Sequence, residues 1–328
     1  MYRAKISGTG SYLPEKILSN KDLEKIVETN DQWIVERTGI RERRIAAPEQ
    51  ATSDLALRAA KNALEMAGLG PRDIDMILVA TVTPDHIMPC TAAVLQDKLG
   101  ARTVFSFDLS AACSGFVYGV SIANQYVKTG LYKNILVIGA ETLSRIVNFK
   151  DRETCILFGD GAGAAIVSRA EPGDVSEILS EHLYADGALN HLLEIPGGGS
   201  RDPFSQSVLD EGRQYVRMKG REIFKNAVRT LAACCEEALT HNKMTIENID
   251  WVVPHQANSR ILEALAKQIK LPMSKLILNV DRTGNTSAAT IPVALDEAVR
   301  DGRIRRGQLT LLAAFGAGLT SGSILLRF

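Results

Sequence analysis

The stretch that decides the fold reads Val104-Phe-Ser-Phe-Asp-Leu-Ser-Ala-Ala-Cys113-Ser-Gly-Phe116. Its first four residues have strand character, and an apolar helical pattern follows from Phe116 to Val127. A strand that turns directly into a helix is typical of α/β folds and places Cys113 close to a helix N-terminus. Unpaired N–H groups there favour negative charge, so we expect a lowered thiol pKa and a thioester-forming nucleophile. A lone cysteine is more often a space-filling core residue, so this interpretation depends on the rest of the chain.

Length and composition limit what the chain can be. It has 328 residues, enough for two domains or two halves of one large domain, and its 45% hydrophobic content is typical of a soluble globular protein. The formal net charge is zero, so no global basic excess argues for nucleic acid. The five cysteines include no CxxC motif, which indicates neither a disulfide framework nor a metal site and favours a reducing, cytoplasmic setting.

The N-terminal residues predict a β-strand rather than a targeting signal. Residues 1–7 read as an edge strand and lack the apolar core of a signal peptide. No apolar run approaches the about 18 residues that a membrane span requires, so we expect no membrane contact.

The chain also resembles itself at an offset of about 175 residues. Helix ends, short loops and strands recur in the same order in two pairs of stretches: 63–79 with 238–253, and 127–138 with 299–313. We therefore expect two similar α/β halves, residues 1–171 and 172–328, each with strands and helices alternating on a mainly parallel sheet. No Pro/Gly/Ser linker separates the halves, which predicts tight packing between them.

Two polar residues of the second half stand out. His255 in Pro-His-Gln-Ala-Asn follows a strand over 251–253, and strand ends are where α/β sheets display catalytic side chains. An offset of 172 pairs Cys113 with Asn285, which we expect to begin a helix after a strand over Leu276–Val280. In a pseudo-two-fold structure the two helix N-termini would meet, and the thiol and amide would share a pocket. In isolation, a histidine such as His255 is more often structural than catalytic, and Asn285 is as often a helix cap as a catalytic residue.

Together these motifs resemble a known family. Cys113 in Ala-Ala-Cys-Ser-Gly, His255 in Pro-His-Gln-Ala-Asn and Asn285 in Gly-Asn-Thr-Ser are similar to the Cys-His-Asn triad of the β-ketoacyl-acyl-carrier-protein synthase III family. These condensing enzymes start bacterial type II fatty-acid synthesis. The resemblance covers essentially the whole chain and includes residues 30–43 and 158–164. It implies a thiolase-like αβαβα layered fold, a homodimer and no cofactor, because the coenzyme A thioester is a substrate.

The resemblance also implies a chemistry. The Cys113 thiolate takes an acyl group from a short acyl-CoA, and malonyl-acyl-carrier-protein then loses carbon dioxide. His255 and Asn285 stabilise the enolate oxyanion, and the resulting carbanion attacks the acyl-Cys113 carbonyl to give 3-oxoacyl-acyl-carrier-protein. The backbone N–H groups of Cys113 and Ala317 form a second oxyanion hole. The family commonly has three glycines where this chain has Gly316-Ala317-Gly318, and alanine fits only if the position does not require a positive φ.

Substrate contacts follow from the same resemblance. Trp33 and Arg152 are expected to flank the adenine of coenzyme A. Met88 is expected to line the acyl pocket, where its flexible side chain could admit a primer other than acetyl. A helix over about 217–240 carries a basic stripe. Residues expected to bind the acidic carrier protein are Arg221, Lys225, Arg260 and Lys267, although an ordinary solvated helix face would look the same.

Four alternatives are weighed against this interpretation. A degradative thiolase would need a second catalytic cysteine, which the late Phe-Gly-Ala-Gly motif at 315–318 lacks. A hydroxymethylglutaryl-CoA synthase would use a glutamate, whereas Asn285 argues for decarboxylation. A related condensing enzyme of secondary metabolism and a non-catalytic paralogue that only binds carrier protein stay open, and the sequence does not give the primer's length or branching.

Overall fold

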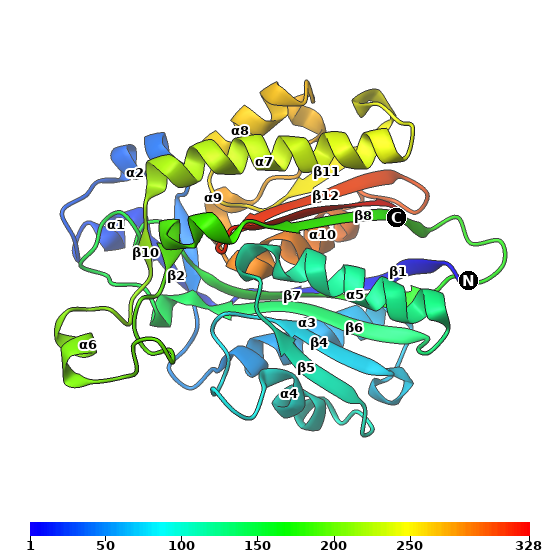
Figure 1. The fold of residues 1–328 in the computed structure, drawn as a ribbon, viewed down its shortest axis with the longest axis horizontal. Helices are drawn as coiled ribbons and strands as arrows, with labels where there is room; N and C mark the ends of the chain where they lie inside the picture. Colours follow the sequence, from blue (N-terminus) through cyan, green and yellow to red (C-terminus); the bar gives the residue numbers. More distant parts are fainter.

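The computed structural model describes residues 1–328 and arranges helices and sheets in alternating layers (Figure 1). Helices α7 (Gly220–His241) and α8 (Ser259–Gln268) cover one sheet, and α3 (Thr52–Ala67) and α4 (Thr91–Leu99) cover the other. Helices α5 (Gly115–Thr129) and α10 (Thr290–Arg300) lie between the two sheets. The αβαβα order expected from the resemblance is thereby confirmed.

Thirteen strands are present. A five-stranded sheet has the order β1-β7-β6-β4-β5 and a four-stranded sheet the order β11-β12-β13-β8, while β2 pairs with β3 and β9 with β10. The bounds are β1 Ala4–Tyr12, β2 Lys16–Ser19, β3 Glu42–Ile45, β4 Met76–Ala80, β5 Phe105–Leu109, β6 Asn134–Thr142, β7 Asp160–Arg169, β8 Glu177–Ala185, β9 Leu193–Glu194, β10 Arg217–Met218, β11 Trp251–Pro254, β12 Leu309–Gly316 and β13 Thr320–Arg327. The predicted N-terminal edge strand is confirmed as β1.

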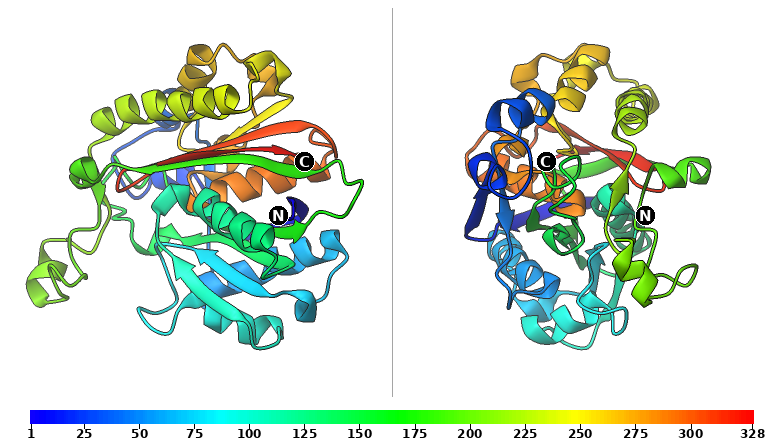
Figure 2. Two further views of the ribbon diagram at one scale, coloured as in Figure 1. Left: turned by 45° about the vertical axis from the view of Figure 1, so that its right-hand side comes forward. Right: turned by 90° about the vertical axis from the view of Figure 1, so that its left-hand side faces the viewer.

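The remaining helices are short and connect the layers. They are α1 (Asn20–Leu23), α2 (Asp31–Thr38), α6 (Gln206–Asp210) and α9 (Val280–Thr283). Figure 2 shows that the segment carrying α6 projects away from the layers in both views. None of the helices combines the length and apolar character needed to cross a bilayer.

Burial explains why the central strands form. Every residue of β4 and β6 is buried, because helices pack on both faces of the five-stranded sheet. Gly139 in β6 allows the closest approach between layers. A Cβ atom there would lie 2.1 Å from the backbone oxygen of Ala288, so only glycine lets the turn before α10 reach the sheet.

The prediction of mainly parallel sheets is wrong. Three of the seven pairings in the two large sheets are parallel (β4 with β5, β4 with β6, β11 with β12), and four are antiparallel. The reason is connectivity, since the chain returns after β6 and after β12 without a crossover helix. The next strand, β7 or β13, therefore runs antiparallel to its predecessor.

The repeat has a constant offset in the structure. Strands β4 and β11, strands β6 and β12, and helices α5 and α10 each begin 175 residues apart. The short 3-10 turns before these helices, η2 (Ala112–Ser114) and η7 (Ser287–Ala289), keep the same offset. Cys113 therefore corresponds to Ala288 and not to Asn285, so the offset of 172 used to pair them is wrong. Asn285 lies two residues before η7.

The strand expected over Leu276–Val280 is also absent. Only Leu276 forms an isolated parallel bridge, with Val252, and α9 begins at Val280. The side chain of Gln256 takes the place of a neighbouring strand. Its Nε2 donates to the Ile277 oxygen at 3.0 Å, and its Oε1 accepts from the Asn279 N–H at 3.1 Å. The Ile277 N–H also donates to the Val252 oxygen of β11 at 2.9 Å, so one side chain and a single bridge hold the segment in place of a ladder.

Candidate active site

Cys113 lies in the η2 turn between β5 and α5. Ala112, which precedes it, has a φ of +45°, an unusual conformation for a residue with a side chain. The cysteine is 7% exposed. Burial raises the pKa of the Cys113 thiol to about 12, while a hydrogen bond from Ser287 acts in the opposite direction. The expected lowering of this pKa is therefore wrong for the free protein, because desolvation outweighs the helix N-terminus.

His255 follows directly on β11 and is buried. Its backbone N–H donates to the Ala313 oxygen at 2.8 Å, which continues the pairing of β11 with β12. Its ring Nδ1 lies 2.7 Å from the hydroxyl oxygen of Thr290. Burial lowers the pKa of His255 to about 3, so the imidazole is neutral over the ordinary working range.

Asn285 is held on both sides. Its N–H donates to the Leu157 oxygen at 2.8 Å, and its own carbonyl accepts from the Gly159 N–H at 3.0 Å. Its side-chain Oδ1 accepts from the Ser287 N–H at 2.8 Å. Because the oxygen of the carboxamide is thus occupied, the NH₂ group remains as the donor.

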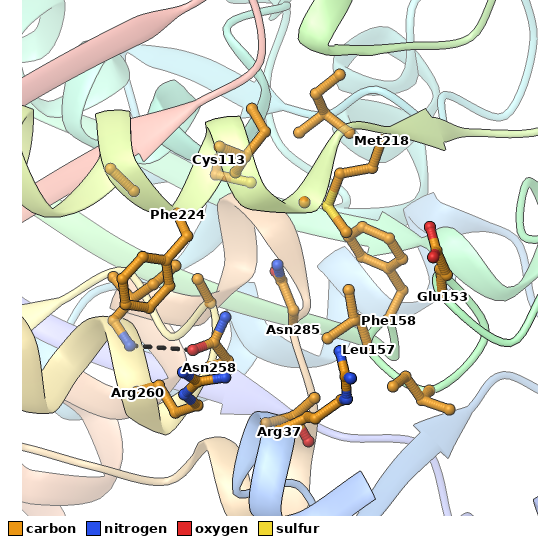
Figure 3. Close-up of a pocket in the computed structure, with 18 of the residues that line it drawn as sticks. Arg37, Cys113, Glu153, Leu157, Phe158, Met218, Phe224, Asn258, Arg260 and Asn285 are labelled. Atoms are coloured by element: carbon orange, nitrogen blue, oxygen red, sulfur yellow. Dashed lines mark hydrogen bonds between the residues drawn. The ribbon is translucent and has the colours of Figure 1, made fainter. Parts of the chain in front are cut away.

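These three side chains line one cavity of about 590 Å³. Figure 3 shows the cavity, with Asn285 between Cys113 and Arg37 in the view. Much of the wall is apolar: Ile156, Leu157, Phe158, Leu193, Met218, Ile223, Phe224, Ala227, Leu231, Ala257, Ile261 and Phe315. The three side chains therefore share one cavity, as the sequence predicted, but the cavity is largely apolar, which the sequence did not predict.

The mouth of the cavity is cationic. The guanidinium groups of Arg37 and Arg152 lie 4.7 and 4.8 Å from the centroid of the Trp33 ring. Arg221 and Arg260 line the same cavity from the starts of α7 and α8, and all four arginines are exposed. The exposed Glu153 lines the cavity too, so four guanidinium groups stand against one carboxylate, and this excess of positive charge suits a ligand with several negative charges.

A tight turn closes the cavity beside Cys113. A Cβ on Gly316 would lie 2.8 Å from the backbone nitrogen of Cys113, so glycine is needed where β12 ends. The Thr320 hydroxyl reaches two carbonyl oxygens, that of Ala111 at 2.9 Å and that of Ala317 at 3.1 Å, and so ties this turn to the cysteine turn. Ala317 is not among the residues with positive φ, so alanine is compatible with the backbone there.

Four residues predicted from the sequence do not line the cavity, and one of them is Ala317, which follows the lining residue Gly316. Lys225 and Lys267 are exposed on α7 and α8 but do not line it. Met88 is 84% exposed in the loop between β4 and α4. The prediction that Met88 lines the acyl pocket is therefore wrong for the cavity of a single chain, because its loop points to solvent.

Sequence reasoning missed several residues of the site. Arg37 lies one helical turn after Trp33 on α2, so the i, i+4 spacing could have found it. Glu141 at the end of β6 is fully buried, and burial raises its pKa to about 7. Its Oε2 accepts from the Thr83 hydroxyl at 2.6 Å and from the Val82 N–H at 3.0 Å. No local pattern marks this residue, because strand periodicity predicts only that it is buried.

The structure contains no group of three or more His, Cys, Asp or Glu side chains placed to bind a metal ion. All five cysteines are free.

Family models match two parts of the chain. Residues 107–187 match the model described as 3-oxoacyl-[acyl-carrier-protein] synthase III, and residues 239–328 match the model of its C-terminal part. The first match contains Cys113, and the second contains His255 and Asn285.

Known proteins are similar over nearly the full length. The chain is 55% identical to a β-ketoacyl-[acyl-carrier-protein] synthase III of Caldanaerobacter subterraneus, over 99% of this chain and 98% of that one. It is 53% identical to the enzyme of that name from Thioalkalivibrio sulfidiphilus, over 100% of both. The crystal structure of 3-oxoacyl-[acyl-carrier-protein] synthase III from Aquifex aeolicus superimposes with a TM-score of 0.92 and 49% identity, over 99% of this chain and 100% of that one. The chain belongs to the 3-oxoacyl-[acyl-carrier-protein] synthase III family.

Proposed function

We propose that this protein condenses a short acyl-CoA with malonyl-acyl-carrier-protein and releases coenzyme A and carbon dioxide. The observation that carries the proposal is the convergence of Cys113, His255 and Asn285 on one cavity with a cationic mouth. Family membership supports the same reaction. The product is a 3-oxoacyl-acyl-carrier-protein, which starts fatty-acid synthesis.

The first half-reaction moves the acyl group to Cys113. The thiolate is the nucleophile, so the proton must leave a thiol whose pKa burial has raised to about 12. The sulfur attacks the acyl carbonyl, the carbon–sulfur bond to coenzyme A breaks, and the proton ends on the coenzyme A thiol. The negative oxygen of the tetrahedral intermediate is stabilised by the backbone N–H groups of Cys113 and Ala317.

The second half-reaction forms the carbon–carbon bond. Malonyl thioester loses carbon dioxide, and its electron pair moves into an enolate. The NH₂ group of Asn285 donates to the enolate oxygen, and the neutral imidazole of His255 donates from Nε2. The enolate carbon then attacks the acyl-Cys113 carbonyl, and the Cys113 sulfur leaves as a thiolate that takes up a proton.

The mouth of the cavity receives both donors in this proposal. Coenzyme A and the phosphopantetheine of the carrier protein are anionic, and the four mouth arginines neutralise such charges. Trp33 and Arg152 hold the adenine of coenzyme A. The carrier protein docks on the starts of α7 and α8 through Arg221 and Arg260, with Lys225 and Lys267 on the same helices adding attraction at longer range.

We also propose a homodimer in the cytoplasm. Strand β5 is an edge of its sheet, and Phe105 on it is 45% exposed. Ile87 and Met88 are 88% and 84% exposed. A second copy of the chain would cover this apolar surface and pair the free strand edge. The free cysteines agree with a reducing compartment.

The proposal is tested by mass spectrometry after incubation with a panel of straight and branched acyl-CoA primers. The expected result is one acyl adduct on Cys113 that disappears when malonyl-acyl-carrier-protein is added, with 3-oxoacyl-acyl-carrier-protein as the product. Cys113→Ser should form no adduct by this route and should not condense. Cys90→Ser is the matched control, because Cys90 is free and only partly buried. Full condensation by Cys113→Ser, or no adduct with any primer, would contradict the proposal.

A further inference from the structure

Ser287 lies outside the predicted triad, but its polar groups lie close to side chains of the triad or to a residue that contacts them. Ser287 opens the η7 turn, is 3% exposed and has a φ of +50°. Left-handed backbone is costly for a residue with a side chain and persists where the surrounding structure holds it. This backbone conformation places the N–H and the hydroxyl of Ser287 near the side chains of the triad.

The backbone N–H of Ser287 sets the direction of the Asn285 side chain. It donates to Asn285 Oδ1 at 2.8 Å, between two buried residues. A carboxamide whose oxygen is bound in this way can turn only its NH₂ group toward the cavity. Without this bond the amide could rotate by half a turn and present an acceptor to the enolate instead.

The Thr290 hydroxyl lies between the Ser287 backbone oxygen and the His255 ring. The Thr290 hydroxyl lies 3.0 Å from the Ser287 oxygen and 2.7 Å from His255 Nδ1. This hydroxyl has one hydrogen, so it donates either to the Ser287 oxygen or to Nδ1. When it donates to Nδ1, the neutral imidazole carries its hydrogen on Nε2 and can stabilise an oxyanion. The shorter contact is the one to Nδ1.

The side-chain hydroxyl of Ser287 stands beside Cys113. The 3-10 turns that carry Cys113 and Ser287 contact each other, and the Ser287 hydroxyl, which has one hydrogen to donate, lowers the pKa of the Cys113 thiol when it donates to the sulfur. The packing agrees with this position, because β6 and η7 approach so closely that a Cβ on Gly139 would meet Ala288. Ser287 is therefore the hydroxyl donor next to the sulfur that must become a thiolate.

We infer that Ser287 is a positioning residue that serves both half-reactions through different groups. Its hydroxyl assists thiolate formation at Cys113 and its N–H aims the Asn285 amide, while the neighbouring Thr290 hydroxyl, by donating to Nδ1, sets the tautomer of His255. This inference rests on the proposed function. It predicts that side-chain changes at Ser287 and at Thr290 affect different steps, although the two residues are three positions apart in one turn.

The test measures the two half-reactions separately. Acylation is followed as the burst of acyl-Cys113 from acyl-CoA, and condensation as a single turnover of isolated acyl-enzyme with malonyl-acyl-carrier-protein. Ser287→Ala keeps the backbone groups, so acylation should slow by about tenfold and condensation should stay within about twofold. Thr290→Val keeps the shape but not the hydroxyl, so condensation should slow by about tenfold while acylation stays within about twofold.

Two further variants separate positioning from folding. Thr290→Ser restores the hydroxyl and should restore condensation. Thr286→Val is the matched control, because the buried Thr286 hydroxyl has no hydrogen-bond partner, and neither half-reaction should change. The ¹⁵N shifts of labelled His255 report the tautomer directly and should show hydrogen on Nε2 in the unmodified protein but a mixture in Thr290→Val.

The outcomes distinguish this inference from the proposed function. If the unmodified protein forms no acyl-Cys113, the proposed function fails. If the unmodified protein is active but Ser287→Ala and Thr290→Val slow both half-reactions by the same factor, or slow neither, the inference is wrong. An unchanged His255 tautomer in Thr290→Val would also overturn the role given to Thr290.

Discussion

Two guanidinium groups lie within cation–π distance of the Trp33 ring, that of Arg37 at 4.7 Å and that of Arg152 at 4.8 Å from its centroid. The arrangement is anchored at both ends. The Asn30 side chain accepts from the Trp33 N–H at 2.8 Å, and Arg152 donates to the Glu28 oxygen at 3.3 Å. A flat ring of a ligand therefore meets a preformed stack of indole and guanidinium at the cavity mouth.

Trp33→Ala should weaken binding of acyl-CoA without changing the chemical step. Loss of stacking worth about 1–2 kcal/mol corresponds to a rise in KM for acyl-CoA of roughly 5- to 30-fold, with kcat little changed. Steady-state kinetics with acyl-CoA as the varied substrate checks this. Trp251→Phe is the control, because Trp251 lies on β11 outside the cavity. Equal effects of the two substitutions would remove Trp33 from the coenzyme A site.

Asn285→Asp should stop condensation but not acylation. Aspartate keeps an oxygen that can accept from the Ser287 N–H, but it replaces the NH₂ donor with a second oxygen. Loss of one oxyanion donor costs about 3 kcal/mol, so condensation should fall by roughly 10²- to 10³-fold. Loss of carbon dioxide from malonyl-acyl-carrier-protein is the direct measurement. Decarboxylation at the unmodified rate would show that Asn285 does not stabilise the enolate.

Charge reversal at basic residues that line the cavity should weaken carrier-protein binding more than charge reversal at a basic residue outside it. Arg260→Glu and Arg221→Glu alter its mouth, so KM for malonyl-acyl-carrier-protein should rise markedly and its salt dependence should weaken. Lys267→Glu should have a smaller effect, because Lys267 is exposed and does not line the cavity. Kinetics at several salt concentrations provide the comparison. Identical effects at all three positions would indicate general attraction rather than docking at the mouth.

Glu141 should make stability depend on pH. Burial raises its pKa from 4.5 to about 7, so the folded protein holds this proton more tightly than the unfolded chain does. Between about pH 4.5 and 7 the unfolded state loses the proton first, and the free energy of unfolding therefore decreases as the pH rises. The shift corresponds to about 3 kcal/mol across this window.

Glu141→Gln lacks this proton and serves as the comparison. The difference in the free energy of unfolding between the unmodified protein and the variant should shift in favour of the variant as the pH rises from 4.5 to 7, and should be flat above that. Denaturant titrations at a series of pH values measure it. If the difference in the free energy of unfolding does not change between pH 4.5 and 7, burial does not raise the pKa of the Glu141 carboxyl.

Local patterns were enough to predict much of the fold. The apolar runs before Cys113 and His255 gave strands β5 and β11, and the helical pattern after Phe116 gave α5. Motifs that resemble those of a known family predicted that Cys113, His255 and Asn285 share one site. The division into halves at residue 171 remains a prediction.

Tertiary contacts explain what the sequence could not show. Leu276–Val280 has strand composition, but its pairing with β11 stops at one bridge, and the Gln256 side chain binds the Ile277 oxygen and the Asn279 N–H instead. The thiol pKa depends on how completely the turns around Cys113 exclude water, which no local pattern records. Ser287 looks like an ordinary helix-start residue until its backbone groups are traced to Asn285 and Thr290.

The contact between Gly139 and Ala288 has a consequence for how the protein fails. The turn η7 packs closely against β6, whose residues are all buried. The catalytic groups beside this turn therefore cannot become mobile independently of the hydrophobic core. The active centre and the hydrophobic interior form one cooperative unit. Heat or denaturant should therefore abolish turnover and global structure at the same midpoint, without a folded but inactive intermediate.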